Sequence, residues 1–143
     1  MLYRKIFLFT LFISLFNNQL VAEQKITDLS DFDGNWHLRV MDGMEVRKAR
    51  AILDFDSKKM ELNGFDGCNR ISGALKRTTE DRFFTTPKTT RMACRGSIQR
   101  YVSKRLHETV RQGFSITEAK RYGVNGITIK SSRHNLFFKK MGD

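Results

Sequence analysis

The sequence predicts an α+β domain that is mainly antiparallel β: a small, cracked β-barrel-like or strongly curved sheet with one amphipathic helix packed on it. Short runs of alternating apolar and polar residues recur along most of the chain, and turn residues separate them. A single stretch has helical periodicity instead. Because no linker or internal repeat divides residues 23–143, we expect them to form a single domain.

Residues 1–22 have the order of a secretory signal peptide. Arg4 and Lys5 come first, an apolar run covers residues 6–16, and the small residue Ala22 stands where cleavage is expected. The apolar run is too short for a comfortable membrane span, so the mature protein is predicted to be periplasmic or secreted, with no transmembrane span. A retained amino-terminal anchor helix is the alternative.

The predicted strands each alternate apolar with polar residues, so that one face of each strand is buried. In chain order they cover residues 36–41, 51–55, 60–62, 71–75, 114–116, 127–129 and 135–138. Turns are predicted at residues 56–58, 63–64, 125–126 and 131–132. Of these, Asn125-Gly126 has the typical sequence of a tight hairpin. The doublets Phe83-Phe84 and Phe137-Phe138 each place one ring on either face of their strand. The inner rings are expected in the core, and the outer rings are in a position to edge a ligand groove.

The helix is expected from Ser97 to Gln112, since its apolar residues fall on one side at helical spacing and a glycine follows. That side comprises Ile98, Tyr101, Val102, Leu106, Thr109 and Val110. The opposite side carries Arg100, Lys104 and Arg111, with His107 beside them. The helix is therefore predicted to present a basic outer face.

The only two cysteines lie in distinctive phrases, Gly67-Cys68-Asn69 with Gly73 four residues beyond Asn69, and Thr90-Arg91-Met92-Ala93-Cys94. With Trp36, the helix and the closing strands, these phrases resemble the META domain, or HslJ-like, family over most of residues 29–140. The resemblance implies a cracked barrel similar to the pilot proteins of bacterial secretion systems. It also implies an envelope protein linked to stress tolerance or secretion, with no established catalytic residues. Residues 118–123 look like extra hairpin length relative to the family.

Cys68 and Cys94 are expected to form a disulfide, because they are the only cysteines and follow an export signal. The glycines permit a tight loop, Asn69 is expected to bond to main chain, and Met92 to fill space beside it. A nucleophilic thiol is the alternative. It is suggested by the flanking Arg70 and Arg95 and by the presence of His37, His107 and His134.

No metal or cofactor is predicted. The three histidines are isolated, and two cysteines alone do not make a zinc site. Asp31-x-Asp33-x-Asn35 resembles the opening of a calcium loop, but Trp36 stands where glycine is needed and Asp42 where glutamate is needed. We expect a solvated turn there. Asp54 and Asp56 share one face of a strand and are expected to be surface charges.

The chain is strongly basic, with a formal net charge of +11, and much of this charge lies in residues 88–111. Such a stripe attracts an anionic lipid, a polysaccharide or an acidic envelope protein, and Arg100, Lys104 and Arg111 are the predicted contacts. Nucleic acid is not expected, because aromatic residues do not interleave with the stripe. A merely solvated helix face is the alternative. We expect a monomer.

The sequence thus favours a non-enzymatic envelope protein that binds an anionic or acidic partner. The alternative is a lipid- or small-ligand-binding module that uses the barrel interior, in a cavity lined by Leu38, Phe55, Ile71 and Phe138. The least favoured hypothesis is that the protein is an enzyme that depends on Cys68 or Cys94.

Overall fold

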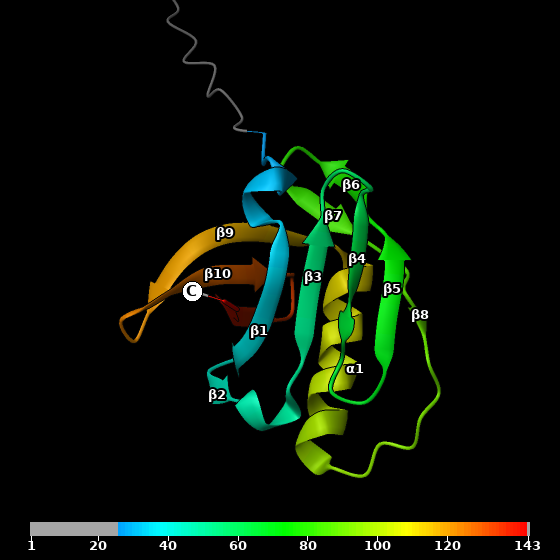
Figure 1. Ribbon diagram of the computed structural model, residues 1–143. Helices are drawn as coiled ribbons and strands as arrows, with labels where there is room; N and C mark the ends of the chain where they lie inside the picture. Colours follow the sequence, from blue (N-terminus) through cyan, green and yellow to red (C-terminus); the bar gives the residue numbers. More distant parts are fainter. Residues whose placement is uncertain (1–25, 143) are drawn as a thin grey trace, which may run out of the picture.

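The computed structural model describes residues 26–142, so the predicted signal peptide of residues 1–22 lies outside the described part (Figure 1). In chain order the elements are η1 (Leu29–Phe32), β1 (Gly34–Met41), β2 (Met44–Glu45), η2 (Arg47–Ala49), β3 (Ile52–Asp56), β4 (Glu61–Phe65), β5 (Arg70–Ala74), β6 (Lys76–Thr79), β7 (Arg82–Phe84), β8 (Lys88–Thr89), α1 (Ser97–Gln112), β9 (Phe114–Arg121), β10 (Val124–Lys130) and β11 (Asn135–Lys140). Within residues 26–142, no helix has the length and apolar character needed to cross a bilayer.

All eleven strands belong to one antiparallel sheet, in the order β6-β7-β9-β10-β11-β1-β3-β4-β5-β8, with β2 paired to β1. Only Leu75 separates β5 from β6, although these strands lie near opposite ends of the sheet. The sheet must therefore curl until its two ends approach each other, and Figure 1 shows the strong curvature in β9 and β10. This curled half-barrel with one helix confirms the predicted fold class.

The helix packs on the inner side of the curled sheet. Val102, Leu106 and Val110 are fully buried there, as the predicted apolar side of the helix requires. The rings of Phe55 and Phe83 lie 6.4 and 6.3 Å from that of Phe114, between centroids, and join the same core cluster. Because aromatic and branched side chains fill the space between sheet and helix, burial of this cluster is the main stabilising contribution to the fold.

The four side chains expected to line an interior ligand cavity, Leu38, Phe55, Ile71 and Phe138, are all buried members of this core cluster. They belong to the same cluster as the buried residues of α1, so at these positions the barrel interior is occupied by the protein's own side chains.

Two of the predicted turns are wrong. Asn63-Gly64 lies inside β4 and Asn125-Gly126 lies inside β10. These glycines are needed for close approach between strands: a Cβ on Gly64 would lie 2.1 Å from the Ile52 carbonyl oxygen, and one on Gly126 2.0 Å from that of Phe138. The β9–β10 hairpin turns instead at Tyr122-Gly123, where both φ angles are positive, as a type I′ turn requires.

The remaining differences lie in the shortest strands. No sequence pattern predicts β2, β6 and β8, because every residue in them is exposed and no apolar alternation marks them. The longer predicted strands and the bounds of α1 are confirmed. Residues 118–123, which look like extra hairpin length, form the end of β9 and its turn into β10.

Candidate functional site

The two cysteine phrases are joined in space, and we call the joined residues 66–70 and 90–94 the signature clasp. Cys68 and Cys94 form a disulfide with their Cα atoms 5.1 Å apart, as predicted, so both cysteines of the chain are oxidised and neither is a free thiol in this structure. Asn69 Oδ1 accepts hydrogen bonds from the Met92 N–H at 2.6 Å and the Thr90 hydroxyl at 3.1 Å. The Thr90 hydroxyl oxygen in turn accepts the Arg70 N–H. The clasp thus fixes the loop before α1 to the end of β5.

Asp66 is the buried centre of this clasp, and the sequence reasoning did not single it out. Its side chain is 1% exposed, and Oδ1 accepts the N–H groups of Cys68 at 2.7 Å and Asn69 at 2.6 Å. Oδ2 lies 2.7 Å from Nε2 of His107 on α1. An aspartate whose side chain accepts from the backbone amides two and three residues later forms an Asx turn. This local pattern could have identified Asp66.

The electrostatics of Asp66 favour its ionised form. Burial is the largest single influence and raises its pKa, but hydrogen bonds from His107, from the amides of Asn69 and Cys68 and from Ser103 together outweigh it and lower the pKa. The imidazole of His107, predicted beside the basic outer face, is therefore directed at the clasp and is only 18% exposed. This buried pair ties α1 to the sheet.

Gly67 and Gly73 sit where a side chain would collide. Gly67 has φ +100°, and its Cβ would lie 3.2 Å from the Gln99 carbonyl oxygen, so the loop passes close to the start of α1. A Cβ on Gly73 would lie 2.3 Å from Thr85 Oγ1 and 3.1 Å from the Pro87 Cα. Both predicted glycine positions are thus places of close approach.

The other predicted motif residues take different places. Trp36 is buried, and its Nε1–H donates to the Phe32 carbonyl at 2.8 Å. Ala93 and Met92 are exposed, so the prediction that Met92 fills space in the clasp is wrong. Only the backbone N–H of Met92 is used, because the side chain of Asn69 accepts it. With 68% of its surface exposed, Met92 marks the outer side of the loop.

The predicted basic face of α1 is present at the surface. Arg100, Lys104 and Arg111 are all exposed. Arg100 Nη1 donates to the carbonyl oxygens of Cys94 at 3.2 Å and Arg95 at 2.9 Å, so this guanidinium also holds the loop before the helix. Lys104 and Arg111 are the residues of this face best placed for an external anion.

A second histidine links α1 to the loops that follow β1 and precede β11. His134 lies between two carboxylates, with Nδ1 2.7 Å from Asp42 Oδ2 and Nε2 2.8 Å from Glu108 Oε2. Burial lowers the pKa of His134, but the hydrogen bonds and charges of Glu108 and Asp42 outweigh this effect and raise the pKa. These two hydrogen bonds tie the helix to the start of β11, and they favour the protonated form of the ring.

Asp33 and Asn35, which resemble part of a calcium loop, form hydrogen bonds with different partners. Asp33 accepts the N–H and the hydroxyl of Ser57 at 2.7 and 2.6 Å, and Asn35 donates to Asp54. Asp56 accepts the Lys59 N–H in the following turn. Across residues 26–142, no group of three or more histidine, cysteine, aspartate or glutamate side chains is arranged so that it could hold a metal ion.

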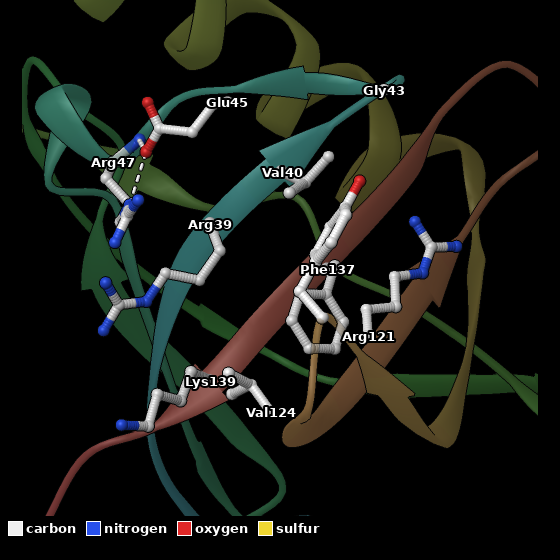
Figure 2. Close-up of a pocket in the computed structure, with 10 residues that line it drawn as sticks. Arg39, Val40, Gly43, Glu45, Arg47, Arg121, Val124, Phe137 and Lys139 are labelled. Carbon is white, nitrogen blue, oxygen red and sulfur yellow. Dashed lines mark hydrogen bonds and ion pairs between the residues drawn. The ribbon is translucent and has the colours of Figure 1, made fainter.

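The outer face of the sheet carries a cavity of about 410 Å³, which we call the outer pocket (Figure 2). Its apolar floor is formed by Val40, Val124 and Phe137. Val40 and Phe137 are only 8% and 2% exposed, yet they do not belong to the core cluster, because they point away from the helix. Phe137, the outer ring of the Phe137-Phe138 doublet, therefore lines this pocket, and whether the pocket binds a ligand stays a prediction.

Two backbone features build this floor. A shift in the β1–β11 register between Leu38 and Val40 leaves Arg39 as an extra residue and places Val40 opposite Phe137. The ring of Phe137 lies against Gly126, where a Cβ would be 2.9 Å from Phe137 Cζ. The bulge and the glycine therefore allow two large outer side chains to lie flat on the sheet. Neither feature has a sequence signal that periodicity can detect.

Cationic side chains border the outer pocket. Figure 2 shows Arg39, Arg47 and Lys139 on one side of the apolar floor and Arg121 on the other. Arg47 pairs with Glu45, whose pKa is lowered first by that hydrogen bond. Arg121 lies over the Phe137 ring, with its guanidinium carbon 5.8 Å from the centroid. Arg39 Nε is buried and has no hydrogen-bond partner among residues 26–142.

The positive potential of this region also affects its neighbours. Burial, and then the charge of Arg39, lower the pKa of His37, so its neutral form is favoured beside the pocket. Glu45 is the one carboxylate that lines the outer pocket, and it is already paired. The pocket therefore has an excess of positive charge beside an apolar floor.

Comparison with known proteins identifies the family and the fold. The model of the META domain family matches residues 27–141. The chain is similar to a protein from Burkholderia xenovorans solved by NMR, with a TM-score of 0.59 and 18% identity over 89% of this chain and 97% of the other. Another NMR structure gives a TM-score of 0.60 and 21% identity over 75% and 88%. No curated protein matches the chain.

Proposed function

Because the chain belongs to the META domain family, we propose that it is a non-enzymatic, exported protein of the bacterial envelope that binds an anionic or acidic partner there. The signal-like residues 1–22 and the disulfide between Cys68 and Cys94 support export, since disulfides persist in oxidising compartments. By resemblance to the family, the physiological role is in stress tolerance or secretion.

The observation that carries this proposal is the exposed basic face of α1. Lys104 and Arg111 project from the outer side of a helix whose inner side is locked into the core. A rigid helix that presents fixed positive charge, on a chain with a net charge of +11, attracts anionic surfaces and acidic partners over about one Debye length.

The test removes charge from the helix without disturbing the clasp. We expect Lys104→Gln with Arg111→Gln to weaken binding to vesicles that contain anionic phospholipid by roughly thirtyfold at low salt, because each basic side chain near such a surface contributes about 1 kcal/mol. Co-sedimentation measures the affinity, and capture of partners from the envelope fraction extends the test to acidic proteins.

The matched control is Lys58→Gln with Lys130→Gln, which removes the same charge from exposed positions that do not belong to α1. This control should lose far less affinity than the helix variant. Equal losses in the two variants would mean that net charge alone attracts the vesicles, and the helix face would no longer be the binding surface. Unchanged binding in the helix variant would reject it directly.

A further inference from the structure

We propose that the outer pocket is a binding site for a small amphipathic anion, a molecule with one acidic headgroup on an apolar body. This site goes beyond the proposed function, because it lies on the opposite side of the sheet from α1 and uses none of the helix residues. The inference rests on three independent features of the pocket: its apolar floor, its unpaired cations and its rigid construction.

The apolar floor fits the body of such a ligand. Val40, Val124 and Phe137 line the same cavity, and its volume of about 410 Å³ lies in the size range of small-ligand sites. Outer faces of antiparallel sheets normally carry polar residues, so an apolar pocket floor there is unusual. An apolar group in this cavity would contact Val124 and Tyr122, which line it and are more exposed than Phe137.

The cations on one side of the floor fit the headgroup. Arg39 and Lys139 line the same side of the pocket without a carboxylate partner among the described residues, and the buried Arg39 Nε lacks any hydrogen bond there. A buried donor without a partner costs free energy, and a carboxylate, phosphate or sulfonate oxygen would satisfy it. Arg121 lies against the Phe137 ring on the other side and would border the apolar body instead.

The pocket is also built before a ligand arrives. Its floor stands on the paired central strands β1, β10 and β11, and the bulge at Arg39 is held by the hydrogen bond from the Val46 N–H to the Arg39 carbonyl at 2.9 Å. Since the floor does not belong to the core cluster, a ligand can enter from solvent without opening the interior. A site on rigid strands loses little entropy on binding.

The experiment uses anilinonaphthalene sulfonate, a fluorescent molecule with one sulfonate on an aromatic body, as the probe. We expect saturable binding of one molecule per folded chain, displacement by decanoate, and much weaker displacement by decanol, which lacks the charge. Arg39→Gln with Lys139→Gln should lower the affinity for the probe roughly tenfold or more, because charge-assisted hydrogen bonds are lost. Val124→Asp should lower it as well, through repulsion and loss of the floor.

The same variants that test the helix serve as controls. Lys104→Gln with Arg111→Gln, and Lys58→Gln with Lys130→Gln, should bind the probe with unchanged affinity. The proposed function can therefore fail while this inference stands, and the reverse. Backbone amide shifts in an NMR titration provide a second measurement, and they should move at Gly43, Val124 and Lys139 rather than along α1.

Three outcomes would overturn the inference. Unchanged probe affinity in the Arg39 and Lys139 variant would remove the anion site. Equal displacement by decanol and decanoate would leave an apolar surface without recognition of charge. Displacement by an acidic peptide at lower concentration than decanoate would show that the pocket accepts a protein segment instead of a small molecule.

Discussion

The signature clasp and the outer pocket differ in whether their polar side chains have partners within the protein. In the clasp, Asp66 and Asn69 each accept at least two hydrogen bonds, and the two sulfurs are bonded to each other. In the outer pocket, Arg39 and Lys139 form no ion pair with any other residue in the described range 26–142. The polar groups of the signature clasp are therefore hydrogen-bonded within the protein, whereas the cations of the outer pocket keep donors that a ligand can use.

This difference teaches where to look for function in the chain. A motif whose donors and acceptors are all paired internally is explained by stability, because each group left unpaired in the interior would cost about 1–3 kcal/mol. A cluster of like charges beside an apolar floor has no such explanation and lowers stability in the free protein. Disturbing the two regions should accordingly change different measured quantities.

The largest effect should follow from removing the disulfide. Cys68→Ser with Cys94→Ser should lower the free energy of unfolding by about 3–4 kcal/mol, because the bond constrains a 26-residue separation in the unfolded chain. Urea unfolding followed by Trp36 fluorescence measures it, and the unmodified protein in reductant should approach the value of the variant. Probe affinity of the outer pocket in the folded fraction should not change. A loss below about 1 kcal/mol would mean that hydrogen bonds alone hold the clasp.

A smaller effect is expected at the carboxylate of Asp66. Asp66→Asn should lower the free energy of unfolding by about 2 kcal/mol at neutral pH, because charge-assisted hydrogen bonds to Cys68, Asn69 and His107 are weakened. Asp31→Asn, at an exposed position on η1, is the matched control and should change stability little.

The pH dependence of the Asp66 contribution has a definite sign. Its folded-state pKa is lowered below the ordinary value of 3.8, so its stabilisation is present above that pH and is lost as the pH falls through the lower folded-state pKa. The difference in stability between the unmodified protein and Asp66→Asn should therefore shrink in acid. A difference that stays constant down to strongly acidic pH would show that the charge of Asp66 is not what holds the clasp.

The features of these two regions that depend on residues close together in the chain could be predicted from the sequence, and those that depend on distant residues could not. Alternation and helical period reveal which residues are buried, and they correctly gave the long strands, the bounds of α1 and the curved sheet. The disulfide was predictable because only two cysteines were available to pair. The exposed short strands lack periodicity and were not found.

The outer pocket was only partly predictable. The position of Phe137 on the outer face follows from alternation, but the register shift at Arg39 depends on pairing with a strand nearly a hundred residues away in the chain. Asn125-Gly126 was wrongly predicted to be a turn. Its glycine is needed because β11 approaches β10 closely there. The local Asx-turn spacing could have identified Asp66, but its pairing with His107 on α1 could not be predicted from neighbouring residues.

The smallest effect on stability is expected when the charges of Arg39 and Lys139 in the outer pocket are removed. Arg39→Gln with Lys139→Gln, the variant that should lose probe binding, should keep the free energy of unfolding within about 0.5 kcal/mol or raise it slightly, because neither half-buried cation has an ion-pair partner among residues 26–142 and the two repel one another. Urea unfolding at low and high salt measures this, and salt should stabilise the unmodified protein more than the variant, since it screens the repulsion. A loss above about 1.5 kcal/mol would instead show that Arg39 holds the bulge, and the outer pocket would then be as structural as the clasp.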